Sequence, residues 1–320
     1  MKKPQISVII PCLNEVNTIG SVVSAASDEL SKSGFDYEII VVDNGSNDGS
    51  ERVAKSHGAN VIHSEARTIA GVRNAGVKIS RGEVLLFLDA DTVVQPGWGQ
   101  AFRPEYKRMK ENDNFITGSP AHAPDNIQPI LYSWYKALSD NVRDTHRATY
   151  HMIVSRKTFK KIGGFDENFI TNEDFNFCSQ AKKHGVIIDS NPEMKVFHHG
   201  YPNSLIDFAK REIWHGLGDC KNWKSRLRSR VFWCGTLFLL LNIVMIFCLF
   251  FYIPLFFILL ATALLMAAGM NFVKFGYGNI RDFTYRSLVS YVYLISRGLS
   301  LPVRLFRKDR FYHWVHSKKS

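Results

Sequence analysis

The sequence predicts an α/β fold with a doubly wound sheet, followed by a hairpin of two membrane-crossing helices. The first observation is that short apolar runs, typical of buried strands, alternate with helix-like segments over residues 5–204. Strands that alternate with helices favour a parallel sheet with helices on both faces. The second observation is that residues 231–273 carry no charged side chain. The chain therefore divides into a globular part and a membrane part.

The pattern along the chain predicts the elements of the globular part. Strands are expected where apolar residues run together, and helices where they recur every three or four positions. The expected strands are residues 6–10, 38–42, 60–63, 84–87, 150–155, 186–188 and 195–197, and the expected helices are residues 18–31, 50–57, 69–79, 172–185 and 205–217. Residues 118–147 are expected to be less regular, because Pro120, Pro124 and Pro129 interrupt them. No internal repeat is evident, which argues against a repeat architecture.

Two carboxylates follow one of these strands. Asp89 and Asp91 come just after residues 84–87, and in open α/β sheets ligands bind at the carboxyl ends of the strands. Two acids one residue apart repel each other unless a cation lies between them, and oxygen ligands suit Mg²⁺ or Mn²⁺. An isolated Asp-x-Asp pair is more often a solvated turn, so its interpretation depends on the rest of the chain.

The chain is basic, and its basic residues are unevenly placed. The 320 residues include 40 Lys and Arg against 29 Asp and Glu, a formal net charge of +11. Nucleic acid, an anionic membrane or an anionic substrate would each explain this excess. Residues 221–230 hold five basic residues and no acid, and residues 304–320 hold six against one Asp. Because both clusters flank the apolar stretch, we expect a membrane partner and no nucleic acid.

The apolar stretch is long enough for two crossings. As a helix it would measure about 64 Å, whereas a bilayer core is about 30 Å thick, so we expect a turn near Pro254. The basic clusters on both outer sides predict that both ends lie in the cytoplasm. Residues 283–306 are expected to form an interfacial amphipathic helix, because Arg297 and Pro302 interrupt a third apolar run. The five cysteines show no disulfide or zinc spacing, in keeping with a cytosolic domain.

Several motifs in the globular part share a family resemblance. They are Val8-Ile9-Ile10-Pro11-Cys12-Leu13-Asn14-Glu15, Val41-Val42-Asp43-Asn44-Gly45-Ser46-Asn47-Asp48-Gly49, Arg73-Asn74-Ala75-Gly76, Asp89-Ala90-Asp91, Gly163-Gly164-Phe165-Asp166-Glu167 and Glu173-Asp174. In this order and spacing they resemble the family 2 glycosyltransferases, which have the nucleotide-diphospho-sugar transferase fold called GT-A, with a doubly wound mixed sheet. The resemblance covers residues 5 to about 204.

The resemblance implies a site for a nucleotide-sugar donor. Asp43, at a strand end, would accept a hydrogen bond from the base N–H, although a turn or cap residue would look the same. Pro11, Asn14 and Glu15 would line the same edge. Arg73 would hold a phosphate or the base edge, unless it is a solvated helix charge.

The resemblance also implies a divalent metal, Mg²⁺ or Mn²⁺. Asp91 would ligate it, and Asp89 would contact the ribose or the metal. In many relatives a histidine completes the metal site, and His198 fits that position better than His199. The simpler alternative is a pair of surface histidines.

The acceptor side depends on a second pair of acids. The resemblance implies that Asp174 is the general base that deprotonates the acceptor hydroxyl, with Glu173 beside it on the acceptor side. Without the resemblance, two acids in the first turn of a helix would be explained by its dipole. Arg211 and His215, on the helix before the membrane segment, would grip an acceptor phosphate or simply anchor that helix at the interface.

These observations together predict a membrane-anchored, inverting glycosyltransferase. It would transfer a sugar from a UDP- or GDP-sugar to a hydroxyl of a lipid-linked saccharide, in surface polysaccharide or glycolipid synthesis. The alternatives are transfer to a polyprenyl phosphate and a non-catalytic sugar-nucleotide-binding scaffold. We expect a cytoplasmic domain at residues 1–220, a basic linker at 221–230, two transmembrane helices at 231–273 and a basic interfacial tail at 274–320. The protein would be a multi-pass protein of the cytoplasmic (inner) membrane.

Overall fold

A computed structural model describes residues 3–141, 148–219, 227 and 229–306. The chain forms two compact units. Of the described residues, unit 1 holds 3–124 and 148–200, and unit 2 holds 125–141, 201–219, 227 and 229–306. The expected basic linker lies largely outside the described residues, as does the end of the expected tail. The division of the chain at residues 220, 230 and 273 remains a prediction.

Unit 1 is built on a mixed sheet of seven strands in the order β3-β2-β1-β4-β8-β6-β9. The strands are β1 (Ile6–Cys12), β2 (Tyr37–Asp43), β3 (Asn60–His63), β4 (Val84–Leu88), β6 (Phe115–Gly118), β8 (His151–Ser155) and β9 (Ile187–Ile188). β3, β2, β1 and β4 are parallel, whereas β8 pairs antiparallel with both β4 and β6. The carboxyl ends of β2, β1 and β4 therefore share one edge of the sheet.

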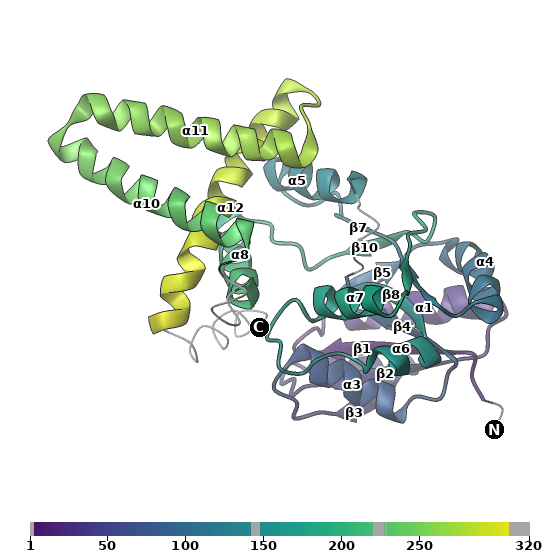
Figure 1. Ribbon diagram of the computed structural model, residues 1–320. Coiled ribbons are helices and arrows are strands. Elements are labelled where there is room, and N and C mark those ends of the chain that lie inside the picture. Colours follow the sequence, from purple (N-terminus) through teal and green to yellow (C-terminus); the bar gives the residue numbers. More distant parts are fainter. Residues whose placement is uncertain (1–2, 142–147, 220–226, 228, 307–320) are drawn as a thin grey trace. The chain divides into compact units, whose positions relative to one another are not determined.

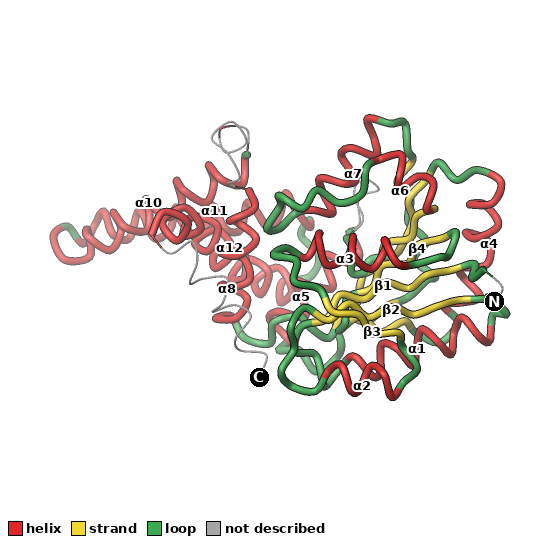
Figure 2. Tube along the Cα trace, turned by 90° about the horizontal axis from the view of Figure 1, so that it is seen from below, coloured by secondary structure: helices red, strands yellow, loops and turns green. Residues whose placement is uncertain are grey.

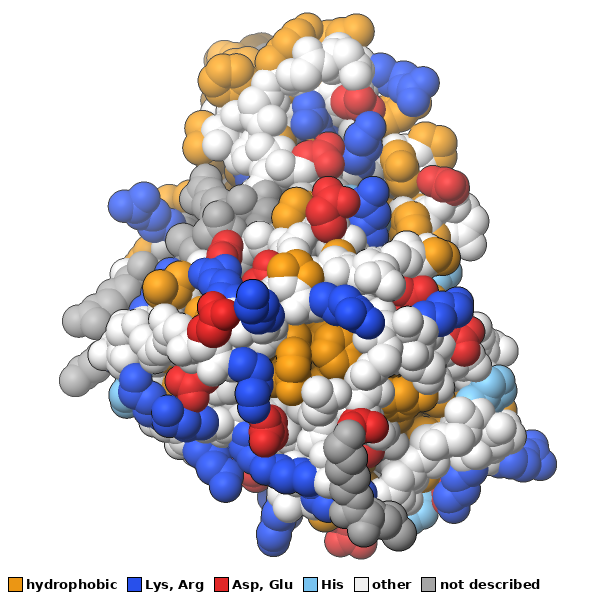
Figure 3. Space-filling model, turned by 90° about the vertical axis from the view of Figure 1, so that its right-hand side faces the viewer, with side chains coloured by type: hydrophobic (Ala, Val, Ile, Leu, Met, Phe, Trp, Pro, Cys, Tyr) orange, Lys and Arg blue, Asp and Glu red, His pale blue; other side chains and the backbone are white. Residues whose placement is uncertain are grey.

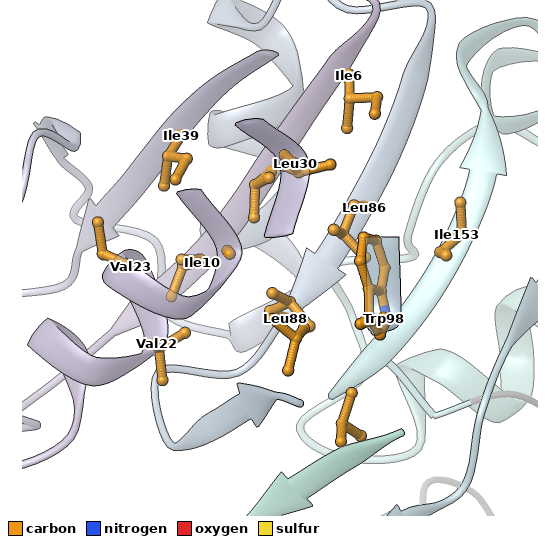
Figure 4. Close-up of a cluster of buried hydrophobic side chains, with 14 of the residues drawn as sticks. Ile6, Ile10, Val22, Val23, Leu30, Ile39, Leu86, Leu88, Trp98 and Ile153 are labelled. Atoms are coloured by element: carbon orange, nitrogen blue, oxygen red, sulfur yellow. The ribbon is translucent and has the colours of Figure 1, made fainter. Parts of the chain in front are cut away.

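Helices cover both faces of this sheet (Figure 2). One face packs against α1 (Ile19–Lys32), α2 (Ser50–Ser56) and α4 (Trp98–Glu111), and the other against α3 (Ile69–Ile79), α6 (Arg156–Ile162) and α7 (Glu173–Lys183). Because the central strands are buried on both faces, their sequences are continuously apolar rather than alternating. Figure 4 shows the core on the α1 face, where Trp98 of α4 lies beside Leu86, Leu88 and Ile153.

The glycine of the Arg73-to-Gly76 motif is required because α3 packs closely against β1 and β2. Gly76 lies in α3, where an added Cβ would come within 2.7 Å of Ile9 and 2.9 Å of Val42. A larger residue would push α3 away from β1 and β2, because protein cores leave no space for an extra methyl group. The glycine thus sets the distance between the sheet and the helix that carries Arg73.

A smaller sheet of three strands completes unit 1. It has the order β5-β10-β7, from β5 (Thr92–Val94), β10 (Val196–His198) and β7 (Ala121–His122). β10 runs antiparallel to β5, with His198 opposite Thr92. This pairing brings a histidine distant in sequence next to the Asp89-Ala90-Asp91 segment.

Unit 2 is helical (Figure 1). It contains α5 (Pro129–Asp140), α8 (Leu205–Asp219), α10 (Arg230–Phe251), α11 (Ile253–Phe275) and α12 (Ile280–Phe306). Helices α10 and α11 form a hairpin, and both are long and apolar enough to cross a membrane. Helix α12 packs against the other four. At its crossing with α10 the backbones of Gly235 and Gly298 approach so closely that a Cβ on either would collide with the other.

Most expected elements are found within a residue or two, but α4, α6, β5 and β6 were not predicted. Pro104 lies inside α4, although prolines usually end helices. Residues 118–147 were expected to be irregular, and this was wrong for residues 129–140, which form α5. Pro129 begins that helix at its first turn, a position where proline is favourable. The expected helix at 283–306 is confirmed as α12, whereas its interfacial location remains a prediction.

Candidate active site

The predicted donor residues gather at the edge where β1, β2 and β4 end. Asp43 is the last residue of β2, and Asp89 and Asp91 follow β4. Pro11 is buried within β1 and pairs in register with Val42 of β2. These positions follow from the parallel strand order β2-β1-β4 and lie where open α/β sheets bind ligands.

One carboxylate oxygen of Asp43 accepts hydrogen bonds, whereas the other has no hydrogen-bond partner among the described residues. Its Oδ2 accepts hydrogen bonds from the backbone N–H groups of Gly45 and Ser46, both at 3.1 Å. Its Oδ1 is buried, and none of the described residues donates to it. Buried acceptors without a partner are rare and costly. The geometry therefore suits an N–H group supplied by a ligand.

The loop after β1 is fixed to the loop after β2. The N–H of Asn14 donates to Ser46 Oγ at 2.9 Å, and Asn14 Oδ1 accepts from the N–H of Asn47 at 2.9 Å. The N–H of Glu15 donates to Ser50 Oγ at 2.7 Å. Asn14 has φ = 54°, which asparagine tolerates better than most residues. The structure thus places Asn14 and Glu15, both predicted to line the nucleotide-sugar site, beside the loop that follows Asp43.

Arg73 is not a solvated helix charge. Its side chain is 1% exposed and lies between two carboxylates, Asp89 Oδ1 and Glu173 Oε1, each at 2.6 Å. Thr149 also donates to Glu173 Oε1, at 3.4 Å. Paired, charge-assisted hydrogen bonds of this kind fix geometry strongly. Arg73 therefore joins the donor-side loop to the start of α7, whereas its predicted contact with a phosphate or base stays a prediction.

Asp89, Asp91 and His198 form a group that can hold a metal ion. One ligand atom from each lies within 4.8 Å of the others, and His198 Nε2 is 3.6 Å from Asp91 Oδ1. Two carboxylates and an imidazole are ligands that Mn²⁺ and similar ions accept. Gly200 encloses the group, because a Cβ at this position would collide with Asp91 Oδ2. The residues present thus fit a divalent cation.

The two histidines differ in their surroundings. His198 is buried and belongs to the metal-binding group, and its ring lies edge-on to Tyr150. His199 is exposed, and its backbone N–H donates to the carbonyl of Asp91 at 2.8 Å. The preference for His198 over His199 agrees with this geometry.

Glu173 and Asp174 begin α7, directly after Asn172, which has φ = 64°. Asp174 Oδ1 accepts the N–H of Phe175 at 2.7 Å. Burial raises the pKa of Asp174, the Phe175 N–H and Arg73 oppose that shift, and the nearby charge of Asp89 adds to it. A carboxylate with a raised pKa is a better base than an ordinary aspartate. Burial also raises the pKa of Glu173, whose ion pair with Arg73 works in the opposite direction.

Arg211 and His215 belong to unit 2, on α8. The Nε of Arg211 donates to His215 Nε2 at 3.3 Å. Burial lowers the pKa of His215 to about 3, so its ring is neutral near pH 7. Their role toward an acceptor stays a prediction.

Sequence reasoning did not predict two features of the site. The partners of Arg73 are 16 and 100 residues away along the chain, so no local pattern could indicate them. The role of Gly200 was missed as well, although the glycine after His198-His199 was a signal that the backbone passes close to another group.

Comparison with known proteins decides the family. A model of the family described as Glycosyl transferase family 2 matches residues 7–172, more than half of the chain. The chain belongs to glycosyl transferase family 2. This membership confirms that the protein is a glycosyltransferase, and the expected GT-A fold with two apolar C-terminal helices is confirmed too.

Relatives of this family 2 transferase support the assignment. Glycosyltransferase AglE of Haloferax volcanii is 34% identical over 231 residues, which cover 69% of this chain and 74% of AglE. The poly(ribitol-phosphate) β-N-acetylglucosaminyltransferase TarP of Staphylococcus aureus is 32% identical over 120 residues, only 36% of this chain and 35% of TarP. The mannosyltransferase PcManGT of Pyrobaculum calidifontis, solved with GDP-Man and Mn²⁺, covers 97% of this chain and 89% of its own, with a TM-score of 0.58 and 15% identity. At that identity PcManGT shows the fold alone.

Proposed function

We propose that this transferase moves a sugar, with inversion, from a UDP- or GDP-sugar to a hydroxyl of a lipid-linked saccharide at the cytoplasmic face of a membrane. One observation carries the proposal. Buried Arg73 binds Asp89 of the donor-side loop and Glu173, the neighbour of Asp174, at 2.6 Å each. A single guanidinium thus holds the metal-binding group and the proposed base in a fixed register, which is the positioning that group transfer needs.

The unsatisfied Oδ1 of Asp43 supports the choice of base. Uracil and guanine each carry a ring N–H at the edge that pairs with other bases, whereas adenine and cytosine carry none there. A buried oxygen that only accepts hydrogen bonds suits such a ring N–H, whereas adenine and cytosine present an acceptor ring nitrogen there and could donate only through their exocyclic amino group. Asn14 and Glu15, with Pro11, would border the same pocket. GDP-Man bound to PcManGT is in keeping with a guanosine donor.

The metal-binding group would serve the leaving diphosphate. Asp91 and His198 would hold Mg²⁺ or Mn²⁺, with Asp89 beside them, as their mutual distances allow. The bound ion would neutralise the negative charge of the nucleoside diphosphate. PcManGT, solved with Mn²⁺, supports the choice of metal.

Asp174 would act as the base. In the transfer the acceptor hydroxyl oxygen attacks the anomeric carbon on the face opposite the nucleotide, and Asp174 takes up the hydroxyl proton. The bond from the anomeric carbon to the diphosphate oxygen breaks with its electron pair, so the configuration inverts. Burial raises the pKa of Asp174 and so increases its proton affinity, while the positive charge of Arg73 partly opposes this rise. Glu173 would orient the acceptor from the adjacent position.

The apolar hairpin supports a membrane-bound acceptor. Helices α10 and α11 would anchor the enzyme in the cytoplasmic membrane, with the catalytic unit in the cytoplasm. An acceptor confined to the same membrane then meets the enzyme in two dimensions.

Figure 3 shows a face of the molecule on which basic and acidic side chains are interspersed, and unit 1 contains surface ion pairs such as Lys110–Glu83 and Arg108–Asp189. Such mixing does not favour a nucleic-acid partner.

A panel of nucleotide sugars tests the proposal. The full chain in lipid nanodiscs, with Mn²⁺ and a membrane lipid extract as acceptor, should release UDP or GDP from one donor of the panel. The Asp174→Asn variant is the control and should release little. Equal release by both proteins would remove Asp174 from the mechanism, and no release from any uridine or guanosine donor would overturn the donor assignment.

A further inference from the structure

Unit 2 encloses three basic side chains around a single carboxylate. Glu212 of α8 forms an ion pair with Arg297 of α12: its Oε2 accepts a hydrogen bond from Nε at 3.1 Å and lies 3.0 Å from Nη2. Both side chains are largely buried, 12% and 14% exposed. Lys274 of α11 and Arg211 of α8 also act on the charge of Glu212. We refer to Arg211, Lys274, Arg297 and Glu212 as the basic cluster.

Aromatic rings, and not acids, surround Lys274. Its Nζ lies 4.3 Å from the ring centroid of Trp134, 5.0 Å from that of Tyr293 and 5.1 Å from that of Phe275. Within the described part of the chain, no carboxylate lies within ion-pair distance of Lys274 or of Arg211. Cation–π contacts stabilise an ammonium group but do not cancel its charge.

Arg211 lies beside a second group that lacks a partner. Its guanidinium is 5.2 Å from the ring centroid of Tyr201, and Tyr201 stacks on Tyr135 at 4.1 Å. Tyr135 is 3% exposed. The hydroxyl of Tyr135 and the Nη1 of Arg211 are both buried, and neither has a hydrogen-bond partner among the described residues. Two buried donors, one of them charged, thus remain available in the same cluster.

The charges of the cluster do not balance. Burial raises the pKa of Glu212, but Arg297, His215, Arg211 and Lys274 together hold it below its usual value, so Glu212 is ionised. His215 is neutral, because burial lowers its pKa to about 3. Three cations and one carboxylate leave a net charge of +2. Burying uncompensated charge is expensive, so a protein seldom keeps it without a counter-ion.

We propose that the basic cluster binds the phosphate or diphosphate group of a membrane lipid, with Tyr135 as an additional donor. A group with two negative charges would balance the cluster and accept hydrogen bonds from Arg211, Lys274 and Tyr135. Lys274 lies in the last turn of the apolar helix α11, where a lysine of a membrane helix lies at the level of the lipid headgroups. This position favours a lipid over a soluble anion. Only the identification of this lipid with the acceptor's own carrier rests on the proposed function.

A titration with lipids of defined headgroup tests the proposal. The full chain in neutral detergent micelles is titrated with phosphatidic acid, which has a terminal phosphate, and in a parallel arm with phosphatidylglycerol, which is anionic without one. A third arm uses inorganic pyrophosphate. Binding is measured from the tryptophan fluorescence, since Trp134 contacts Lys274, and from the shift in unfolding temperature. Phosphatidic acid should bind at least about tenfold more tightly than phosphatidylglycerol.

The variants Arg211→Gln and Lys274→Gln should each weaken phosphatidic acid binding about 10- to 100-fold. Arg281→Gln is the matched control, because Arg281 is an exposed arginine of α12 in the same unit. It should change the affinity by less than about twofold, since exposed charges contribute little. Without lipid, the Gln variants should be at least as stable as the wild type, because each removes a partly buried charge that no carboxylate pairs with. Arg211→Lys and Lys274→Arg should restore most of the binding.

Three results would overturn the proposal. Equal binding of phosphatidic acid and phosphatidylglycerol, or an equal loss in Arg281→Gln, would show only a general attraction to anionic lipid. Pyrophosphate binding as tight as that of phosphatidic acid, lost in the Gln variants, would overturn the lipid as the source of the anion. Asp174→Asn should bind phosphatidic acid normally while it loses transfer, so a failure of the proposed reaction is distinguishable from a failure of this site.

Discussion

The two units treat buried positive charge in opposite ways. In unit 1, Arg73 is buried between Asp89 and Glu173, so its charge is more than balanced within the chain. In unit 2, Lys274 contacts aromatic rings, and no carboxylate in the described part of the chain forms an ion pair with Lys274 or Arg211. A balanced buried arginine positions other residues, whereas an unbalanced one calls for a ligand. Under the two proposals, Arg73 would hold the reaction geometry, whereas the basic cluster would bind a lipid phosphate.

The largest effect is expected for the proposed base of unit 1. Asp174→Asn keeps the size of the side chain but removes the proton acceptor, so kcat should fall about 10²- to 10⁴-fold. The affinity for the nucleotide sugar, measured by calorimetry, should change little, because we propose that Asp43 and the metal-binding group hold it. Near-normal turnover would reassign the base, with Glu173 and Asp166 as the next candidates.

Arg73→Gln should be costly for unit 1. It leaves the buried Glu173 and the partly exposed Asp89 without their cation, and breaking a buried pair costs about 3–5 kcal/mol in the free energy of unfolding. Arg81→Gln is the control, because Arg81 pairs with Glu38 at 3.4 Å and is 56% exposed, so its loss should cost less than about 1 kcal/mol. Chemical unfolding followed by circular dichroism would compare the two.

A milder substitution isolates the positioning role of Arg73. Arg73→Lys keeps the charge but can bridge the two carboxylates less well than the planar guanidinium. It should restore most of the stability and still lower kcat more than it raises the donor KM. If Arg73→Lys and the wild type had the same kcat, Arg73 would serve stability alone.

Metal removal tests the other side of the same site. Asp91→Asn deletes one charge from the group that includes Asp89 and His198. Changes near metal ligands cost about 10- to 100-fold in metal affinity, so loss of a ligand should weaken Mn²⁺ binding at least tenfold. Asp28→Asn, at an exposed position of α1, is the control and should have no effect. Full turnover in excess chelator would refute metal dependence.

The pH dependence of kcat should show how burial shifts the pKa of Asp174. Because burial raises its pKa, the base is ionised only above a pH that is higher than the ordinary aspartate value of 3.8. Activity should therefore decline as the pH falls through this raised pKa. This acid limb of kcat should disappear in Asp174→Asn. A limb at or below pH 3.8 would show that the carboxylate is not shifted.

Sequence alone predicted the parts of the molecule whose causes are local. The strands around β1, β2 and β4 are continuously apolar, and the donor residues stand at their ends. The parts that sequence missed depend on distant partners. The role of Arg73 was predicted without its partner Glu173, 100 residues away, and the basic cluster joins helices α8, α11 and α12. Helix α4 was missed for a different reason, since Trp98 and Phe102 are buried well enough to outweigh the local cost of Pro104.

The smallest effect is expected at the contact between α10 and α12 in unit 2, where the hydrogen-bonded groups are neutral. The hydroxyl of Tyr291 on α12 donates to Asn242 Oδ1 on α10, and Asn242 Nδ2 donates to the carbonyl of Phe238 at 2.8 Å. Tyr291→Phe leaves that oxygen without its donor among apolar helices. Hydrogen bonds between membrane helices contribute about 0.6 kcal/mol on average, so the loss should be of that size. Tyr285→Phe, on the same helix, removes a hydroxyl for which the structure records no hydrogen bond and should change nothing.

A double variant then separates the energy of the Tyr291–Asn242 hydrogen bond from the cost of leaving one buried polar group unpaired. Replacing both partners, as in Asn242→Leu with Tyr291→Phe, should recover the stability that Tyr291→Phe alone loses, because no polar atom is then left unpaired. Thermal unfolding in neutral micelles gives the free-energy cycle for the four proteins. A coupling energy near zero would mean that α10 and α12 are held by packing alone, at the Gly235–Gly298 crossing. A coupling above about 2 kcal/mol would exceed the range of such neutral contacts and would make this pair comparable to the charged contacts of unit 1.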